Sequence, residues 1–202
     1  MKKEFNLKNQ YIESWNYIKQ SRNFIWCIVL IFLIFTVLGF LFPTPEFIRK
    51  LIIDFLKSIL EKTKGFYVQD WISFIFLNNL QSSFFGLLFG LFFGIYPILG
   101  AIANGYVLGF VGNMAVSEVG LLSLWRIFPH GIFELPAVFI SLGLGMRIGI
   151  VTIQKLFQKK KIRTFQYYLL NSLRVFFYVV IPLLIIAALI EGVLISISIP
   201  GA

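Results

Sequence analysis

The chain has 202 residues, of which 58% are hydrophobic, 18% aromatic and only 13% charged. Soluble domains carry about 25% charged residues, so this composition excludes an ordinary soluble globular protein, and its apolar content excludes a disordered one. The net charge of +9 comes from residues that flank apolar segments, which favours an anionic membrane surface over nucleic acid as their partner.

The N-terminal part predicts a short amphipathic helix on the membrane surface, followed by a first membrane span. Tyr11, Trp15 and Ile18 recur at helical spacing among basic residues. No charged residue lies between Asn23 and Pro45, and this segment is long enough to cross a bilayer. Cys27, the only cysteine, excludes an intrachain disulfide and is expected to be a small apolar group in this span.

The segment of about residues 45–62 predicts an amphipathic helix that does not cross the membrane. Thr44, Pro45 and Glu46 are typical of a helix start. Apolar and charged residues then separate onto opposite faces of the predicted helix. We therefore expect this helix to lie on the membrane surface or to pack on a partner.

The rest of the chain predicts four further spans and a single all-α membrane domain over residues 1–202. Pro97 and Gly100 are expected to mark the turn between the second and third spans, and residues 118–128 to be interfacial or re-entrant. The predicted fold is a polytopic helical membrane protein of the plasma or inner membrane. Its expected spans are about 24–42, 73–95, 98–116, 129–150 and 167–190.

The distribution of basic residues predicts the orientation. One segment, expected to be a loop, carries basic residues and no acidic one: Arg147, Lys155, Lys159, Lys160, Lys161 and Arg163. The positive-inside rule places this segment in the cytoplasm. With four spans before it, the N-terminus is also cytoplasmic, the C-terminus is outside, and the 45–62 helix faces out. Arg147 and Arg174 are interpreted as side chains that reach the interface from span ends.

Small residues recur at the spacing that lets membrane helices approach closely. Gly86, Gly90 and Gly94 follow one another at four-residue intervals in the second span, and Gly105 and Gly109 do so in the third. We expect these glycines to form helix-packing faces, with the neighbouring helix in the same chain or in another.

A polar cluster is predicted in and just before the fourth span, where placing polar groups in the membrane costs free energy. It consists of Arg126, His130 and Glu134, with Asn104 of the third span as a further member. His130 and Glu134 are one helical turn apart, so their side chains share a face. Four interpretations remain open: a self-neutralising structural cluster, a divalent metal site with His130 and Glu134 as ligands, a proton relay and a hydrolytic site. The sequence lacks the HExxH and GxSxG patterns, which makes the hydrolytic site the weakest of the four.

Two strings carry a family resemblance. The segment from Asn104 to Gly109 (NGYVLG) and the segment from Pro129 to Ala137 (PHGIFELPA) resemble the stage II sporulation protein M family, over roughly residues 70–190. The resemblance implies a five-span membrane protein. It also implies a scaffold of the kind that works with peptidoglycan-remodelling enzymes during engulfment of the forespore. The wider family, with the PHGxxELPA motif, extends to bacteria and archaea that do not sporulate.

The functional expectation is a non-enzymatic membrane scaffold or assembly factor. Its expected partners are the lipid bilayer, a second copy of the chain, with a dimer favoured, and other membrane or cell-envelope proteins, but not nucleic acid. The alternative is a small transporter or channel component that uses Asn104, His130 and Glu134 as a polar pathway, and an intramembrane enzyme ranks third. No cofactor is predicted, apart from the divalent metal considered above.

Overall fold

The computed structural model describes residues 6–122, 128–157 and 165–198, and it is all-helical, as the sequence predicts. The elements follow in chain order. They are α1 (Leu7–Leu41), α2 (Glu46–Lys62), α3 (Val68–Leu88), the 3₁₀ turn η1 (Phe89–Leu91), α4 (Ile95–Val119), α5 (Phe128–Phe157), α6 (Phe165–Val175), the π-helical turn η3 (Phe176–Val180) and α7 (Ile181–Ser198).

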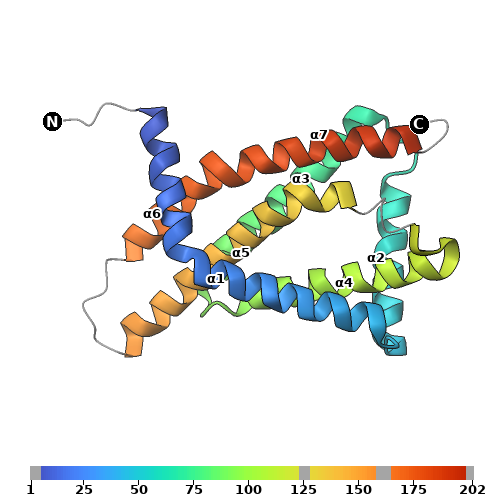
Figure 1. Cartoon of the computed structure of the whole chain (residues 1–202), viewed down its shortest axis with the longest axis horizontal. Coiled ribbons are helices and arrows are strands. Elements are labelled where there is room, and N and C mark those ends of the chain that lie inside the picture. The colour runs from blue at the N-terminus through green and yellow to red at the C-terminus, as the bar shows by residue number, and fades with distance from the viewer. Residues whose placement is uncertain (1–5, 123–127, 158–164, 199–202) are drawn as a thin grey trace.

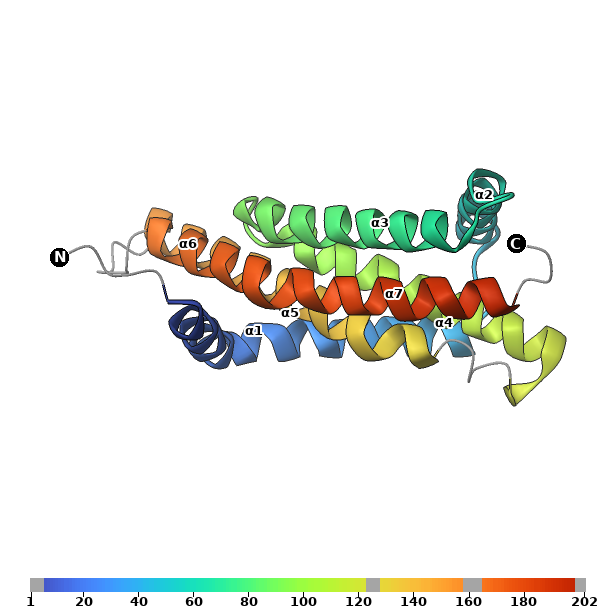
Figure 2. The same ribbon diagram turned by 90° about the horizontal axis from the view of Figure 1, so that it is seen from above.

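Five of the described helical segments are long and apolar enough to cross a membrane, which confirms the predicted span count. They are Leu7–Leu41, Val68–Leu91, Ile95–Val119, Gly131–Phe157 and Phe165–Ile195. The long helices lie side by side along one direction (Figures 1 and 2). The start of α1, the end of α5 and the start of α6 lie at one end of this bundle, here called the first end. The short helix α2 and the end of α7 lie at the opposite end, here called the second end.

The N-terminal part differs from its prediction because one helix replaces two. The expected surface helix and the expected first span join in the continuous helix α1, which begins after Asn6, whose side chain accepts a hydrogen bond from the Lys8 backbone at 3.0 Å. No proline or glycine lies between Leu7 and Val37 to interrupt it. The helix bends, however, so that its dark blue first part crosses the bundle and the remainder lies along α4 (Figures 1 and 2).

The turn between the second and third spans lies earlier than predicted. The chain reverses at Phe92–Gly94, where Phe93 has a φ of 56° and Gly94 a φ of 74°. Glycine adopts this left-handed backbone without steric cost. Pro97 and Gly100 instead lie inside α4. Proline at the third helical position sacrifices no hydrogen bond, because the first-turn N–H groups have no partner within the helix.

The fourth and fifth spans are longer than predicted. Helix α5 continues to Phe157, so Arg147 and Lys155 lie in a helix and not in a loop. The rest of the basic segment, from Lys159 to Arg163, lies outside the described residues. In the fifth span, η3 precedes Pro182, which cannot donate a backbone hydrogen bond; a π-turn is one way for a helix to accommodate such a break.

The second end of the bundle carries the two connections expected to be interfacial. Helix α2 matches its predicted range closely, buries only Ile52 and runs across the long helices (Figures 1 and 2). Helix α4 continues to Val119, so Glu118 lies in its last turn and not in a separate segment. Most of the remaining residues expected to be interfacial, 123–127, lie outside the described residues.

The glycines singled out in the sequence lie at two close helix contacts within the chain. Between α3–η1 and α5, a Cβ on Gly90 would collide with the backbone of Gly145, and one on Gly86 would lie 2.5 Å from Leu142 Cδ2. Between α1 and α4, a Cβ on Gly105 would meet the backbone of Phe32 and one on Gly109 that of Thr36. Gly94 belongs to the turn and packs near Met146. At both contacts the two helix backbones touch, so only glycine, which has no Cβ, fits at Gly90, Gly105 and Gly109.

Candidate functional site: a cavity and an arginine cage

A cavity of about 850 Å³ opens between α1, α4 and the first turns of α5. Its walls come from the second half of α1, the middle of α4 and the segment from Gly131 to Leu135. Among the described lining residues, all but three are apolar or glycine. The three polar ones are Thr36, Asn104 and Glu134.

The structure therefore brings two of the four predicted cluster residues to one cavity. Glu134 is only 9% exposed, whereas Asn104 is exposed. The Asn104 side chain donates a hydrogen bond of 2.8 Å to the carbonyl of Gly100 in its own helix. The Asn104 amide therefore reaches the preceding turn of its own helix.

The other two cluster residues are only partly placed. The backbone of α5 carries His130 one turn before Glu134, as predicted, but the His130 side chain and Arg126 lie outside the described structure. The ion pair and the metal site thus stay predictions. In the part of the chain that the structure describes, no three His, Cys, Asp or Glu side chains come together.

An apolar layer separates this cavity from the first end of the bundle. Ile28, Ala101 and Leu142 are 0%, 0% and 4% exposed and pack together with Phe32, which also lines the cavity. Beyond them, Leu144 and Ile148 belong to a second buried cluster that extends into α6 and α7. On the side that faces the first end, the cavity therefore borders close-packed apolar side chains of α1, α4 and α5.

Arg147 of α5 lies beyond that layer, in a cage of aromatic and hydroxyl groups from two helices, α1 and α6. Its guanidinium carbon is 4.5 Å from the ring centre of Tyr17 and 5.2 Å from that of Tyr168. Its Nη1 donates a hydrogen bond of 2.6 Å to Ser21 Oγ. Ring faces attract a cation through their quadrupole, so the cage stabilises the charge without a carboxylate.

The cage is itself tied together by hydrogen bonds. The Tyr17 hydroxyl donates to the carbonyl of Tyr168 at 3.2 Å, and Ser21 donates to the carbonyl of Tyr17 at 2.8 Å. Ser172 lies 3.5 Å from the Tyr17 hydroxyl. The interpretation of Arg147 as a side chain that only reaches the interface is therefore wrong. It joins α1 and α6 to α5, and no sequence pattern links residues so far apart.

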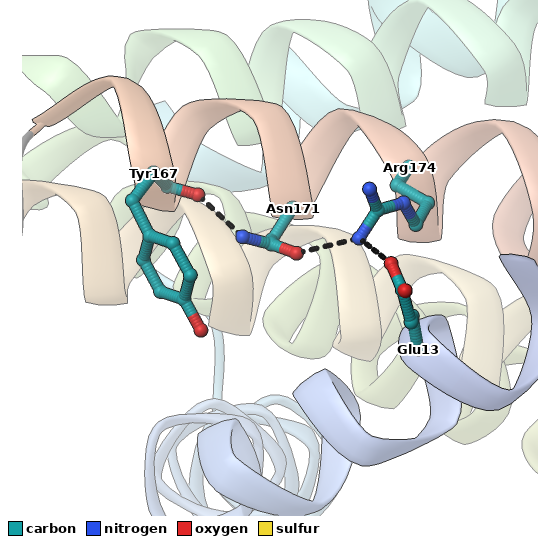
Figure 3. Close-up of polar contacts among 4 residues, drawn as sticks. All are labelled: Glu13, Tyr167, Asn171 and Arg174. Carbon is teal, nitrogen blue, oxygen red and sulfur yellow. Dashed lines mark hydrogen bonds and ion pairs between the residues drawn. The ribbon is translucent and has the colours of Figure 1, made fainter. Parts of the chain in front are cut away.

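A second polar chain holds the first part of α1 against α6 (Figure 3). Arg174 Nη1 lies 2.6 Å from the Glu13 carboxylate and donates to Asn171 Oδ1 at 2.8 Å. Asn171 in turn donates to the carbonyl of Tyr167 at 2.7 Å. The Glu13 and Arg174 side chains are 43% and 28% exposed, so this ion pair orients α1 more than it stabilises the fold.

The fold and these sites define the class of the protein: a multi-span helical membrane protein whose polar groups gather at both ends of one bundle. The family model for stage II sporulation protein M matches residues 28–194, and the chain belongs to this family. The match confirms the resemblance inferred from the two strings and extends it to the first span. No curated protein and no solved structure in the comparisons matches the chain.

Proposed function

We propose that this protein is a non-enzymatic membrane scaffold or assembly factor that associates with a second copy of itself. The observation that carries the proposal is the apolar layer of Ile28, Ala101 and Leu142 between the Glu134 cavity and the Arg147 cage. A transported ion or polar solute needs polar partners along its whole path, since desolvation without compensation is costly. This layer offers no such partner.

The cavity supports the proposal in a second way. It is largely apolar, and its rim includes Val37 of α1, which is 52% exposed. Membrane helices associate through close packing, with few polar contacts, so an apolar recess beside α1 and α4 suits a spanning helix of another protomer. We propose a dimer because twofold association is the commonest form of self-assembly.

The orientation is part of the same proposal. The five described spans put the start of α1 and the end of α7 at opposite ends of the bundle (Figure 1). The acid-free basic segment that follows α5 favours a cytoplasmic first end. Cysteine variants at Lys160 and Ala202, in a Cys27→Ser background, are expected to label from the inside and the outside respectively. Labelling of both from one side would contradict this topology.

Photo-crosslinking tests the scaffold proposal at the cavity. A photoreactive phenylalanine analogue at Val37 is expected to give a crosslinked species of twice the chain mass in native membranes. The matched control is Leu189 of α7, which is 48% exposed and does not line the cavity. Equal dimer yields from both positions, or none from Val37, would contradict self-association through the cavity.

The alternative, a transporter or channel component, has one observation in its favour: Asn104 and Glu134 line the same cavity. It predicts ion flux that is lost in Glu134→Gln while the purified variant keeps the wild-type thermal stability. The scaffold proposal predicts no flux in either protein.

A further inference from the structure

A second cavity lies at the first end of the bundle, on the α3–α4 turn. It has a volume of about 470 Å³, is open to the outside, and is lined by Leu91 of η1, by Val151, Thr152, Lys155 and Leu156 of α5 and by Phe165 of α6. Among the described lining residues, Lys155 is the one charged group, and all the others except Thr152 are apolar. The cavity thus combines apolar side chains with a basic group, whereas the first cavity combines them with the acidic Glu134.

Its position relative to the membrane follows from the α3–α4 turn. Phe92 and Phe93 in this turn are 63% and 48% exposed, and exposed phenylalanines at a tight turn between two spans belong in lipid, not in water. The turn is held to α5 at Gly149, where an added Cβ would meet the backbone of Gly90 and Gly94. The base of the cavity, at Leu91, therefore lies at the edge of the hydrocarbon region.

Lys155 lies further from the membrane centre than this turn. It is six residues beyond Gly149 in α5, which is about 9 Å along the axis at 1.5 Å per residue. That distance places the start of the Lys155 side chain at the outer side of the headgroup layer, whose thickness on each side is about 5–8 Å. The flexible side chain can reach back from there to a headgroup phosphate. Lys155 is exposed, and among the described residues no carboxylate forms an ion pair with it.

We propose that this cavity binds an anionic phospholipid, with its headgroup phosphate on Lys155 and an acyl chain against Leu91, Val151 and Phe165. The charge at the mouth and the apolar base match the two parts of such a lipid, and basic pockets between spanning helices are typical sites for anionic headgroups. The sequence that follows α5 carries four more basic residues, Lys159, Lys160, Lys161 and Arg163, and clusters of basic residues next to a span are typical of segments that bind anionic lipid.

Native mass spectrometry of the purified full chain, titrated with phosphatidylglycerol or phosphatidylcholine, tests the proposal. The wild type is expected to retain phosphatidylglycerol more tightly. Lys155→Gln should weaken this binding about fivefold, as expected for the loss of about 1 kcal/mol per basic group near the surface. Lys155→Arg should keep it. Lys57→Gln, on α2 at the second end, removes the same charge and should leave binding unchanged.

A second variant separates the pocket from general electrostatics. Thr152→Trp fills the cavity and keeps Lys155, so it should also release the lipid while thermal stability is retained. Equal losses in Lys155→Gln and Lys57→Gln, or equal binding of the two lipids by the wild type, would overturn the proposal. Competition by millimolar inorganic phosphate would likewise overturn it, because it would identify a free-phosphate site and not a lipid site.

Discussion

Each end of the bundle has a charged side chain inside it, and the surroundings of the two side chains differ. Near the second end, the Glu134 carboxylate lies 9% exposed at the wall of a cavity of about 850 Å³. Near the first end, the Arg147 guanidinium is enclosed by Tyr17, Tyr168 and Ser21, at distances of 4.5, 5.2 and 2.6 Å. The arginine holds three helices together, whereas the glutamate is placed beside space that another molecule can enter.

The difference teaches that an intramembrane charge does not by itself indicate a functional site. Ionisable groups at membrane depth are costly and invite a functional interpretation. Arg147 meets that cost with aromatic faces and a hydroxyl, which leaves it a structural role. The cavity, and not the charge, is the reason why we propose the Glu134 end as the place for a partner.

The largest effect is expected at the glycine contact that fixes α3–η1 against α5. Gly90→Leu should prevent folding or remove most of the stability, because even its Cβ would collide with the Gly145 backbone. Gly90→Ala should already lower the thermal unfolding temperature. Gly100→Ala is the control, since its Cβ would lie an ordinary 3.5 Å from Leu142 Cδ2. Equal stability of the two alanine variants would show that the helices do not touch at Gly90.

The next effect concerns Glu134 and His130, one turn apart in α5. If the two side chains form a buried pair, each of Glu134→Gln and His130→Ala should cost about 3–5 kcal/mol, because the remaining partner loses its compensation. The double variant should then cost less than the sum. Unfolding of the four proteins in detergent measures this cycle, and strict additivity would exclude the pair.

Further measurements on the same four proteins separate the metal and relay hypotheses from a structural pair. A metal site predicts that a chelator lowers the unfolding temperature and that a divalent ion restores it. A proton relay predicts stable single variants with lost transport. A structural pair predicts chelator-insensitive stability.

A smaller effect is expected at the cage. Arg147→Ala removes two cation–π contacts and a charged hydrogen bond, and it should lower the free energy of unfolding by about 2–3 kcal/mol. Arg147→Lys keeps the charge but lacks the planar group that stacks between rings, so its loss should be intermediate. If both variants were as stable as the wild type, Arg147 would not join the helices.

The smallest effect is expected at the exposed pair of Figure 3. Glu13→Gln should cost at most about 1 kcal/mol, and less at high salt, because Glu13 and Arg174 are partly solvated. A spin label at Lys8 should nevertheless become more mobile, since the pair orients the first part of α1 on α6. Unchanged mobility would show that the cage alone fixes this segment.

The helical spans were predictable because their apolar length is a local property of the sequence. Two boundaries were less predictable: the turn between the second and third spans, expected at Pro97, and the break expected after Arg22 between the surface helix and the first span. Proline is compatible with both a turn and a first helical turn. The change from polar to apolar composition after Arg22 suggested two helices, although no proline or glycine interrupts the segment. The family follows from strings around Asn104 and His130, which are local as well.

The two sites were predictable to different degrees for the same reason. Glu134 and Asn104 stand out as polar residues in apolar segments, so the sequence could single them out before the cavity was visible. The cage could not be found, because Tyr17 and Tyr168 are 151 residues apart and look like ordinary interface aromatics. The packing of α1 and α6 against α5 brings them to Arg147.

Ion flux in proteoliposomes tests most directly the claim that an apolar layer separates the two ends. The wild-type chain is reconstituted with a pH-sensitive dye inside the vesicles, and a proton gradient or a potassium diffusion potential is applied. The account predicts the same dye response as in protein-free vesicles, with either sign of the potential. Flux above that level that disappears in Glu134→Gln would contradict it and establish the polar pathway instead.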